Sequence, residues 1–251
     1  MVIYIYLVNY LVKEGYKPTT GELPENGDWD YDSLGNYGSI IFFRYSDEAN
    51  IHRMMQQFPQ MKFCSLSFMM DNILSVNPNE MLGAELLAGH LAQKGIKNIM
   101  ILEDRDNRAY RYRSSIFSGA FQYLVSEASL NYLQYRDICE NEDMEKLIGN
   151  YLDKCEKLPD AFFCPRGWDA EILYNLLKKR NVQVPNDVRI CCFDRPTDGY
   201  GQTMPFPYVD FDLRDMAKAC VFLLRKSATN IEYYPEQILI PVALHEPDNQ
   251  Q

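Results

Sequence analysis

The sequence predicts an α/β fold, in which a mostly parallel sheet is flanked by helices. Short, continuous apolar runs at residues 40–43 and 99–102 are typical of parallel strands that are buried on both faces. Between such runs, apolar residues recur at helical spacing, as they do from about residue 112 to residue 127. Strands therefore alternate with helices along the chain, and parallel pairing then requires crossover helices.

The clearest β-α-β unit lies between residues 159 and 194. Strands are expected at 161–164 and 189–194, and Ala170, Leu173 and Leu177 mark the helix between them. The second strand ends in the carboxylate of Asp194. Because open α/β sheets bind small molecules beyond the carboxyl ends of their strands, this unit predicts a ligand site near Asp194.

The other elements follow from the same patterns and from helix caps. Ser46 is a candidate N-cap, and Gly95 is a candidate helix stop. Strands are expected at 40–43, 62–67, 99–102 and 237–244, and helices at about 46–57, 79–94, 112–127, 144–152 and 212–226.

The first 38 residues leave two alternatives open. In one, residues 7–15 form a helix that ends at Gly15, and Tyr16 and Lys17 start a strand. In the other, residues 2–8 are themselves a strand. Residues 19–38 are polar and rich in glycine, aspartate and asparagine, which predicts a long loop.

The composition limits the kinds of partner that the chain can be expected to have. Its 251 residues suffice for one large domain or two lobes, and the net charge is −10. No block of lysine and arginine is present, so we expect no direct contact with nucleic acid. No run approaches the ~20 apolar residues of a membrane helix, and residues 1–8 lack the flanks of a signal peptide. We therefore expect no membrane contact and a cytoplasmic location.

Signatures of catalytic and metal sites are missing from the sequence. The seven cysteines include no CxxC pair, which favours reduced thiols, and the three histidines have no metal-like spacing. No phosphate-binding glycine motif, GxSxG or HExxH occurs. We expect no metal, no cofactor and no catalytic residue, and an enzyme is the least favoured class.

Three segments carry a resemblance to a known family. They read GAELLAGHL at residues 83–91 with GIKNI at 95–99, PDAFFC at 159–164, and VPNDV at 184–188 followed by Phe193 and Asp194. In this order they resemble the effector-binding domain of the lactose-repressor and galactose-repressor family, which is similar to bacterial periplasmic sugar-binding proteins. The resemblance covers roughly residues 39–247.

The resemblance implies a two-lobed periplasmic-binding-protein-like fold with three chain crossings. The first lobe would comprise 1–74 plus 211–230, truncated at its start, and the second 75–210 plus 231–251. A ligand would lie in the cleft, the lobes would close on it, and the chain would form a homodimer through helix 46–57 and the surface of the first lobe. Nothing before Ser39 resembles the DNA-binding module of the family, so DNA would be contacted only through a module outside this chain.

The resemblance also implies ligand-binding positions. The carboxylate of the family falls on Asp194. Arg166 and Gly167 stand where the family often has Asn-Asp, and Arg195 replaces a second aspartate. Counted back from Gly119, Ile116 takes the place of a frequent arginine. From these three departures we expect the family's usual contacts to a neutral sugar to be largely absent.

Arginines are abundant in the loops that follow the strands. Guanidinium groups bind carboxylate and phosphate in bidentate fashion, which makes an anionic sugar one hypothesis. The alternative is that these arginines pair with neighbouring acids, among them Asp169. The arginines in question are Arg105, Arg108, Arg111, Arg113, Arg166 and Arg195.

Trp168 is expected either to stack on a sugar ring or to pack within its lobe. Arg44, Tyr45 and Ser67 end strands of the first lobe and are candidate cleft walls. The predicted ligand-binding residues are Asp194, Arg166, Trp168, Arg113, Arg108, Arg44, Tyr45 and Ser67.

These expectations favour the sugar-sensing effector domain of a bacterial transcriptional regulator. Such a domain would bind a small carbohydrate, neutral or anionic, and would signal by closure of its lobes within a dimer. The alternative is the solute-binding protein of a sugar transporter, which would require export.

Overall fold

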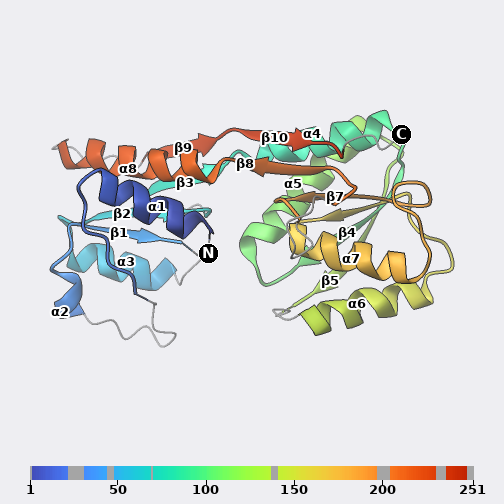
Figure 1. The fold of residues 1–251 in the computed structure, drawn as a ribbon, viewed down its shortest axis with the longest axis horizontal. Helices are drawn as coiled ribbons and strands as arrows, with labels where there is room; N and C mark the ends of the chain where they lie inside the picture. The colour runs from blue at the N-terminus through green and yellow to red at the C-terminus, as the bar shows by residue number, and fades with distance from the viewer. Residues whose placement is uncertain are drawn as a thin grey trace. The chain divides into compact units, whose positions relative to one another are not determined.

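The computed structural model describes residues 2–21, 31–43, 48–68, 70–136, 141–196, 204–229 and 236–247. The chain divides into two compact units, and it passes between them at three places. The first unit comprises Met1–Asn79 and Asp212–Pro241, and the second comprises Glu80–Phe211 and Val242–Gln251. Each unit is a mostly parallel sheet flanked by helices (Figure 1), which confirms the predicted fold class.

The sheet of the first unit has the strand order β1-β2-β3-β9, and every pairing in it is parallel. Its strands are β1 (Ser39–Phe42), β2 (Lys62–Leu66), β3 (Leu74–Pro78) and β9 (Gln237–Ile240).

Helices cover both faces of this first sheet. On one face, α3 (Glu48–Gln57) packs its buried Ile51 and Met54 against Phe63 of β2. On the other face, α8 (Leu213–Thr229) brings the Cys220 thiol to 3.6 Å from that of Cys64. Because neighbouring residues of a strand point to opposite faces, β2 is apolar on both sides.

The N-terminal segment is α1 (Val2–Lys13), which packs against α8. The helical alternative for this segment is therefore confirmed, although the helix starts earlier than residue 7, and the strand alternative is wrong. No strand forms at residues 16–17 within the described chain. The loop predicted for 19–38 contains the short α2 (Tyr31–Leu34), and residues 22–30 lie outside the described part.

The sheet of the second unit has the order β10-β8-β7-β6-β4-β5. All its pairings are parallel except that of the edge strand β10 with β8. The strands are β4 (Asn98–Asp104), β5 (Ser129–Tyr135), β6 (Ala161–Cys164), β7 (Arg189–Phe193), β8 (Tyr208–Phe211) and β10 (Val242–His245).

Two apolar layers sandwich this second sheet. Phe163 of β6 stacks on Phe117 of α5 at 3.9 Å between ring centroids, whereas Phe162 packs in the cluster on the opposite face. A strand buried on both faces must be a continuous apolar run, as β6 is. The helices of this unit are α4 (Glu80–Gln93) and α5 (Arg108–Leu124) on the first face, and α6 (Asn141–Lys154) and α7 (Gly167–Lys179) on the second.

Three strands were not predicted, namely β3, β5 and β8, and one predicted strand is divided. Residues 237–244 form β9 and β10, which flank Pro241 and belong to different units. Proline lacks the amide hydrogen that a ladder needs. The expected bounds of the lobes differ accordingly: residues 75–79 and 236–241 belong with the first unit, where β9 pairs with β3.

No helix in the described ranges combines the length and the apolar character that a membrane span requires.

Candidate ligand-binding site

Asp194 lies directly after β7, at the carboxyl end of the second sheet. Its φ is 64°, and its amide donates a 2.8 Å hydrogen bond to the carbonyl of Val209 on β8. Aspartate is one of the few residues that tolerate this left-handed conformation. The turn leaves the side chain 40% exposed, so its carboxylate can accept hydrogen bonds from a ligand.

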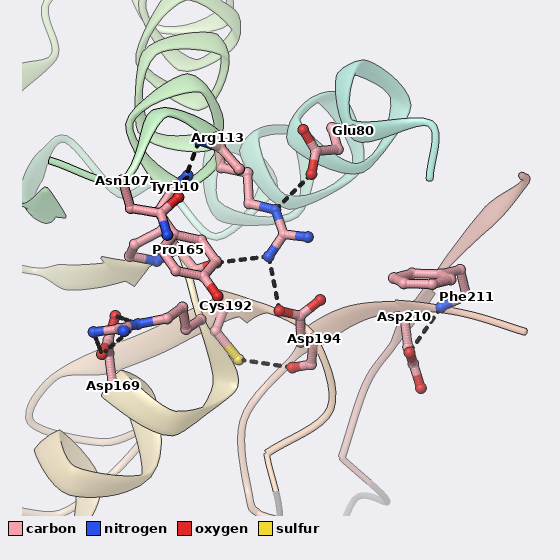
Figure 2. A network of polar contacts seen from close by, with 12 residues as sticks. Glu80, Asn107, Tyr110, Arg113, Pro165, Asp169, Cys192, Asp194, Asp210 and Phe211 are labelled. Atoms are coloured by element: carbon pink, nitrogen blue, oxygen red, sulfur yellow. Dashed lines mark hydrogen bonds and ion pairs between the residues drawn. The ribbon is translucent and has the colours of Figure 1, made fainter. Parts of the chain in front are cut away.

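Arg113 of α5 binds the carboxylate of Asp194 (Figure 2). Its Nη1 donates to Oδ2 of Asp194 at 2.7 Å and to the carbonyl of Pro165 at 3.0 Å. Its Nε donates to Oε1 of Glu80 at 2.8 Å. An arginine on this helix therefore does reach Asp194, but it comes from position 113 and not from position 116, where counting back from Gly119 had placed it.

One buried guanidinium thus serves two carboxylates. Burial raises the pKa of Glu80 above its ordinary value, and the nearby charge of Asp194 adds to this, while Arg113 opposes it. Burial by itself would lower the pKa of Arg113, but Asp194 and Glu80 outweigh burial and raise it. Arg113 is therefore permanently charged, and Glu80 binds a proton more readily than an ordinary glutamate does.

Arg166 forms a second ion pair beside the first. Its Nε donates to both carboxylate oxygens of Asp169, at 2.9 and 3.0 Å, and its Nη2 donates to the hydroxyl of Tyr135 at 3.1 Å. Asp169 is 0% exposed and accepts a further hydrogen bond from that hydroxyl at 3.1 Å. Burial raises the pKa of Asp169, and Arg166 and Tyr135 counteract this effect.

Aromatic rings line both guanidinium groups. The guanidinium carbon of Arg166 lies 4.5 Å from the ring centroid of Trp168 and 5.0 Å from that of Tyr110. The guanidinium carbon of Arg113 lies 5.7 Å from the same Tyr110 ring and 4.9 Å from that of Phe193. One face of Trp168, which was expected either to stack on a sugar ring or to pack within its lobe, is therefore occupied by Arg166.

Gly167 allows the loops that carry these side chains to meet. A Cβ atom at this position would lie 2.8 Å from the carbonyl oxygen of Asp194 and 2.9 Å from the nitrogen of Pro196. Real Cβ atoms do not approach the backbone so closely, so the first turn of α7 lies directly on the loop after β7.

Of the remaining predicted residues, the structure describes Arg108 and Ser67. Arg108 is the exposed first residue of α5. Ser67 belongs to the first unit, where it follows β2 with a φ of 65° and donates to the sulfur of Met216 at 3.8 Å. Arg44 and Tyr45 lie outside the described residues.

Glu80, Tyr110 and Tyr135 belong to this site, although sequence reasoning did not select them. Glu80 is the first residue of α4 and follows β3, which was not predicted. Tyr135 is the last residue of β5, which was also not predicted. Had β5 been recognised, the rule that selected Asp194 would have indicated Tyr135. Glu80 follows a strand of the first sheet, and its place beside Arg113 depends on how α4 packs against α5.

The site contains more carboxylates than guanidinium groups. Arg113 and Arg166 face the carboxylates of Glu80, Asp194 and Asp169, and Arg195 pairs with Asp210 at 3.5 Å. No group of acids, histidines and cysteines that could hold a metal occurs in the described part of the chain. The arrangement offers hydrogen-bond acceptors and donors around aromatic rings, which is the chemistry that binds hydroxyl groups.

Together, the fold and the site define a two-unit α/β protein with a polar site at the carboxyl ends of a parallel sheet. The chain belongs to the family of periplasmic binding protein-like domains, whose model matches residues 88–246. This membership confirms the resemblance found in the sequence at the level of the family and its fold. A search of the curated proteins found no match.

Solved structures of similar fold include several described as transcriptional regulators. A LacI regulator from Bacillus cereus subsp. cytotoxis is 20% identical with a TM-score of 0.80, and the match covers 98% of this chain and 89% of that one. A LacI family regulator from Enterococcus faecium with bound ribose is 15% identical with a TM-score of 0.79, covering 98% and 92%. A periplasmic binding protein/LacI transcriptional regulator from Alkaliphilus metalliredigens, complexed with D-xylulofuranose, is 17% identical with a TM-score of 0.76, covering 98% and 91%.

Proposed function

We propose that this chain is the effector-binding domain of a bacterial LacI-type transcriptional regulator and that it senses a neutral carbohydrate. The observation that carries the proposal is the pair formed by Arg113 and Asp194, which presents a partly exposed carboxylate at a strand end. A charged acceptor of this kind makes strong hydrogen bonds to hydroxyl groups. The ribose and D-xylulofuranose bound to two structural relatives support this ligand class.

The pairing of the arginines favours a neutral ligand over an anionic one. Arg166 already forms an ion pair with the buried Asp169, and Arg113 forms ion pairs with Asp194 and Glu80. A phosphate or sugar acid would have to displace one of these carboxylates or lie beside the exposed Asp194. Since like charges repel strongly in a partly buried site, a polyol without charge fits the site better.

Signalling would use the division into two units. The chain crosses between them at three places, and a ligand that binds one arrangement of the units more tightly would shift the population toward it. In this proposal the chain acts in the cytoplasm as a homodimer, it performs no catalysis, and DNA is contacted through a module outside it.

Titration calorimetry tests the ligand class. D-ribose and D-xylulose should bind, whereas ribose 5-phosphate and glucuronate should bind at least tenfold more weakly. Asp194→Asn should weaken binding about tenfold or more, because a charged acceptor contributes about 1.5–3 kcal/mol. Asp153→Asn is the matched control, since Asp153 lies exposed on α6. Binding of only the acidic sugars, or equal binding by the Asp194→Asn variant, would contradict the proposal.

A solute-binding protein of a sugar transporter is the second candidate, because the family name and the Alkaliphilus relative include that class. The buried free thiols of Cys164, Cys191 and Cys192 weigh against an oxidising location. Fractionation of the source cells distinguishes the two, since a regulator stays with the cytoplasm.

A further inference from the structure

In the described part of the chain, β5 is an edge strand of the second sheet. It pairs with β4 on one side, and no described strand pairs with its other side. Its seven residues, Ser-Leu-Asn-Tyr-Leu-Gln-Tyr, contain no charge, no proline and no glycine. Natural edge strands usually carry lysine, proline or a bulge that prevents pairing with another chain. An edge without these features is suited to strand addition.

The hydrogen bonds to β4 show which backbone groups of β5 point outward. The amide of Ser129 donates to the carbonyl of Lys97, and the carbonyl of Tyr135 accepts from the amide of Arg105. Odd-numbered residues therefore direct their amide and carbonyl groups toward β4. Because successive residues of a strand alternate in this direction, Leu130, Tyr132 and Gln134 present theirs to the outside.

We propose that β5 pairs antiparallel with β5 of a second copy of this chain, about a two-fold axis at Tyr132. In this register Tyr132 lies opposite its own copy, and Leu130 lies opposite Gln134. All outward amide and carbonyl groups of these residues then find partners, because each opposed pair exchanges both of its hydrogen bonds. The contact is closed, since the same strand is used by both copies.

The distribution of charge favours a second copy as the occupant. Each copy carries a net charge of −10, so most surfaces of two copies repel each other, and an uncharged strand is a place where they can meet. Glu127 precedes the strand and Arg136 follows it, with side chains 79% and 65% exposed. In this register Arg136 lies opposite Ala128 of the other copy, one residue from Glu127, whereas parallel pairing would bring like charges together.

A cavity beside the edge would receive side chains of the second copy. It has a volume of about 350 Å³ and lies between α5 and β5, where Ser118, Gly119, Tyr132 and Gln134 line it. The hydroxyl of Tyr132 donates to Ser118 at 2.9 Å, so the even-numbered side chains of β5 lie on the face covered by α5. Leu130 and Tyr132 of an added strand would lie on the same face, at the mouth of this cavity.

Sedimentation velocity on the complete chain tests the contact with a pair of opposite charges. Tyr132→Lys and Tyr132→Glu each place two like charges opposite one another at the axis. Each variant alone should therefore lose the β5–β5 contact, and the mass of its assembly should be half that of the wild type. In an equimolar mixture of the two variants the β5–β5 contact should form again, with one chain of each variant, because lysine then faces glutamate. Regained association also shows that both variants are folded.

Tyr123→Lys and Tyr123→Glu serve as matched controls, since Tyr123 is 89% exposed on α5 and lies off the edge. Both should sediment as the wild type does. The proposal is overturned if the wild type is monomeric at about 100 µM, if the Tyr132 variants keep its mass, or if their mixture stays dissociated. The assay contains no ligand, so its outcome is independent of the sugar-binding proposal.

Discussion

Arg113 shows how a single residue determines the character of the site. Its guanidinium is buried and joins Glu80, at the start of α4, to Asp194, at the end of β7. Both carboxylates share one positive charge, and only that of Asp194 is substantially exposed. A ligand that hydrogen bonds to Asp194 therefore meets a carboxylate whose position is fixed from the protein side.

Replacing Glu80 by glutamine should change the dependence of stability on pH. Burial raises the pKa of Glu80 above 4.5, so the folded protein binds this proton more tightly than the unfolded chain does. Glu80 therefore reduces the free energy of unfolding as the pH rises through 4.5, and the reduction persists at neutral pH. Relative to the wild type, Glu80→Gln should gain stability between pH 4 and pH 7, as measured by urea unfolding.

Glu127→Gln is the control for this experiment, because it makes the same change of residue type at a glutamate whose side chain is 79% exposed. A Glu80→Gln variant that loses stability relative to the wild type as the pH rises would show that the attraction of Arg113 outweighs burial.

Removing Asp169 should be the most damaging single change in the site. Asp169→Ala leaves Arg166 without its bidentate partner in a largely buried position, which typically costs about 3–5 kcal/mol of unfolding free energy. Asp153→Ala removes an exposed partner of Arg180 and should cost less than about 1 kcal/mol. Equal losses for the two variants, measured by denaturant unfolding, would refute a structural role for the buried pair.

The sequence could indicate which residues lie at this site, but not how they pair. Asp194 and Arg166 were predicted because residues that follow neighbouring parallel strands meet at one edge of the sheet. The reach of Arg113 depends on how α5 is rotated, and the burial of Asp169 depends on how α7 packs. Neither property is encoded in local spacing. The sequence therefore left open whether these arginines pair with neighbouring acids or bind an anionic ligand.

At the scale of elements, the close approach of α7 to the loop after β7 is the most demanding contact. Gly167→Ala forces a Cβ atom against backbone atoms of Asp194 and Pro196, which should cost about 1–3 kcal/mol and displace the carboxylate. Gly89→Ala, in α4, meets no atom within 4 Å and should stabilise the protein by about 0.5–1 kcal/mol. Thermal unfolding of both variants measures whether each is less or more stable than the wild type. A Gly167→Ala variant as stable as the wild type would disprove the tight contact.

Elements with continuous apolar runs were predictable, whereas three strands with polar residues were not. β3 contains the buried Ser75 and Asn77 and ends at Pro78, which obscures the pattern of a strand. β5 is an edge strand of mixed exposure, and β8 has four residues and follows a proline-rich stretch. In each case pairing with neighbouring strands, and not local composition, determines the structure.

At the scale of the whole molecule, the excess of acid opposes association. The chain has 35 aspartates and glutamates against 25 lysines and arginines, so two copies repel each other over a range set by the Debye length. That length falls from about 30 Å at 0.01 M salt to about 10 Å at 0.1 M salt. Exposed ion pairs such as that expected between Glu127 and Arg136 contribute little at either concentration.

Self-association through β5 should therefore strengthen severalfold when the salt concentration is raised from 0.01 M to 0.1 M. The backbone hydrogen bonds of the strands do not depend on salt, while the repulsion between two copies with a net charge of −10 is screened. Dissociation constants from sedimentation equilibrium at the two salt concentrations check this expectation. A contact that weakens with salt would instead depend on opposite charges, and the uncharged strand could not then be its main component.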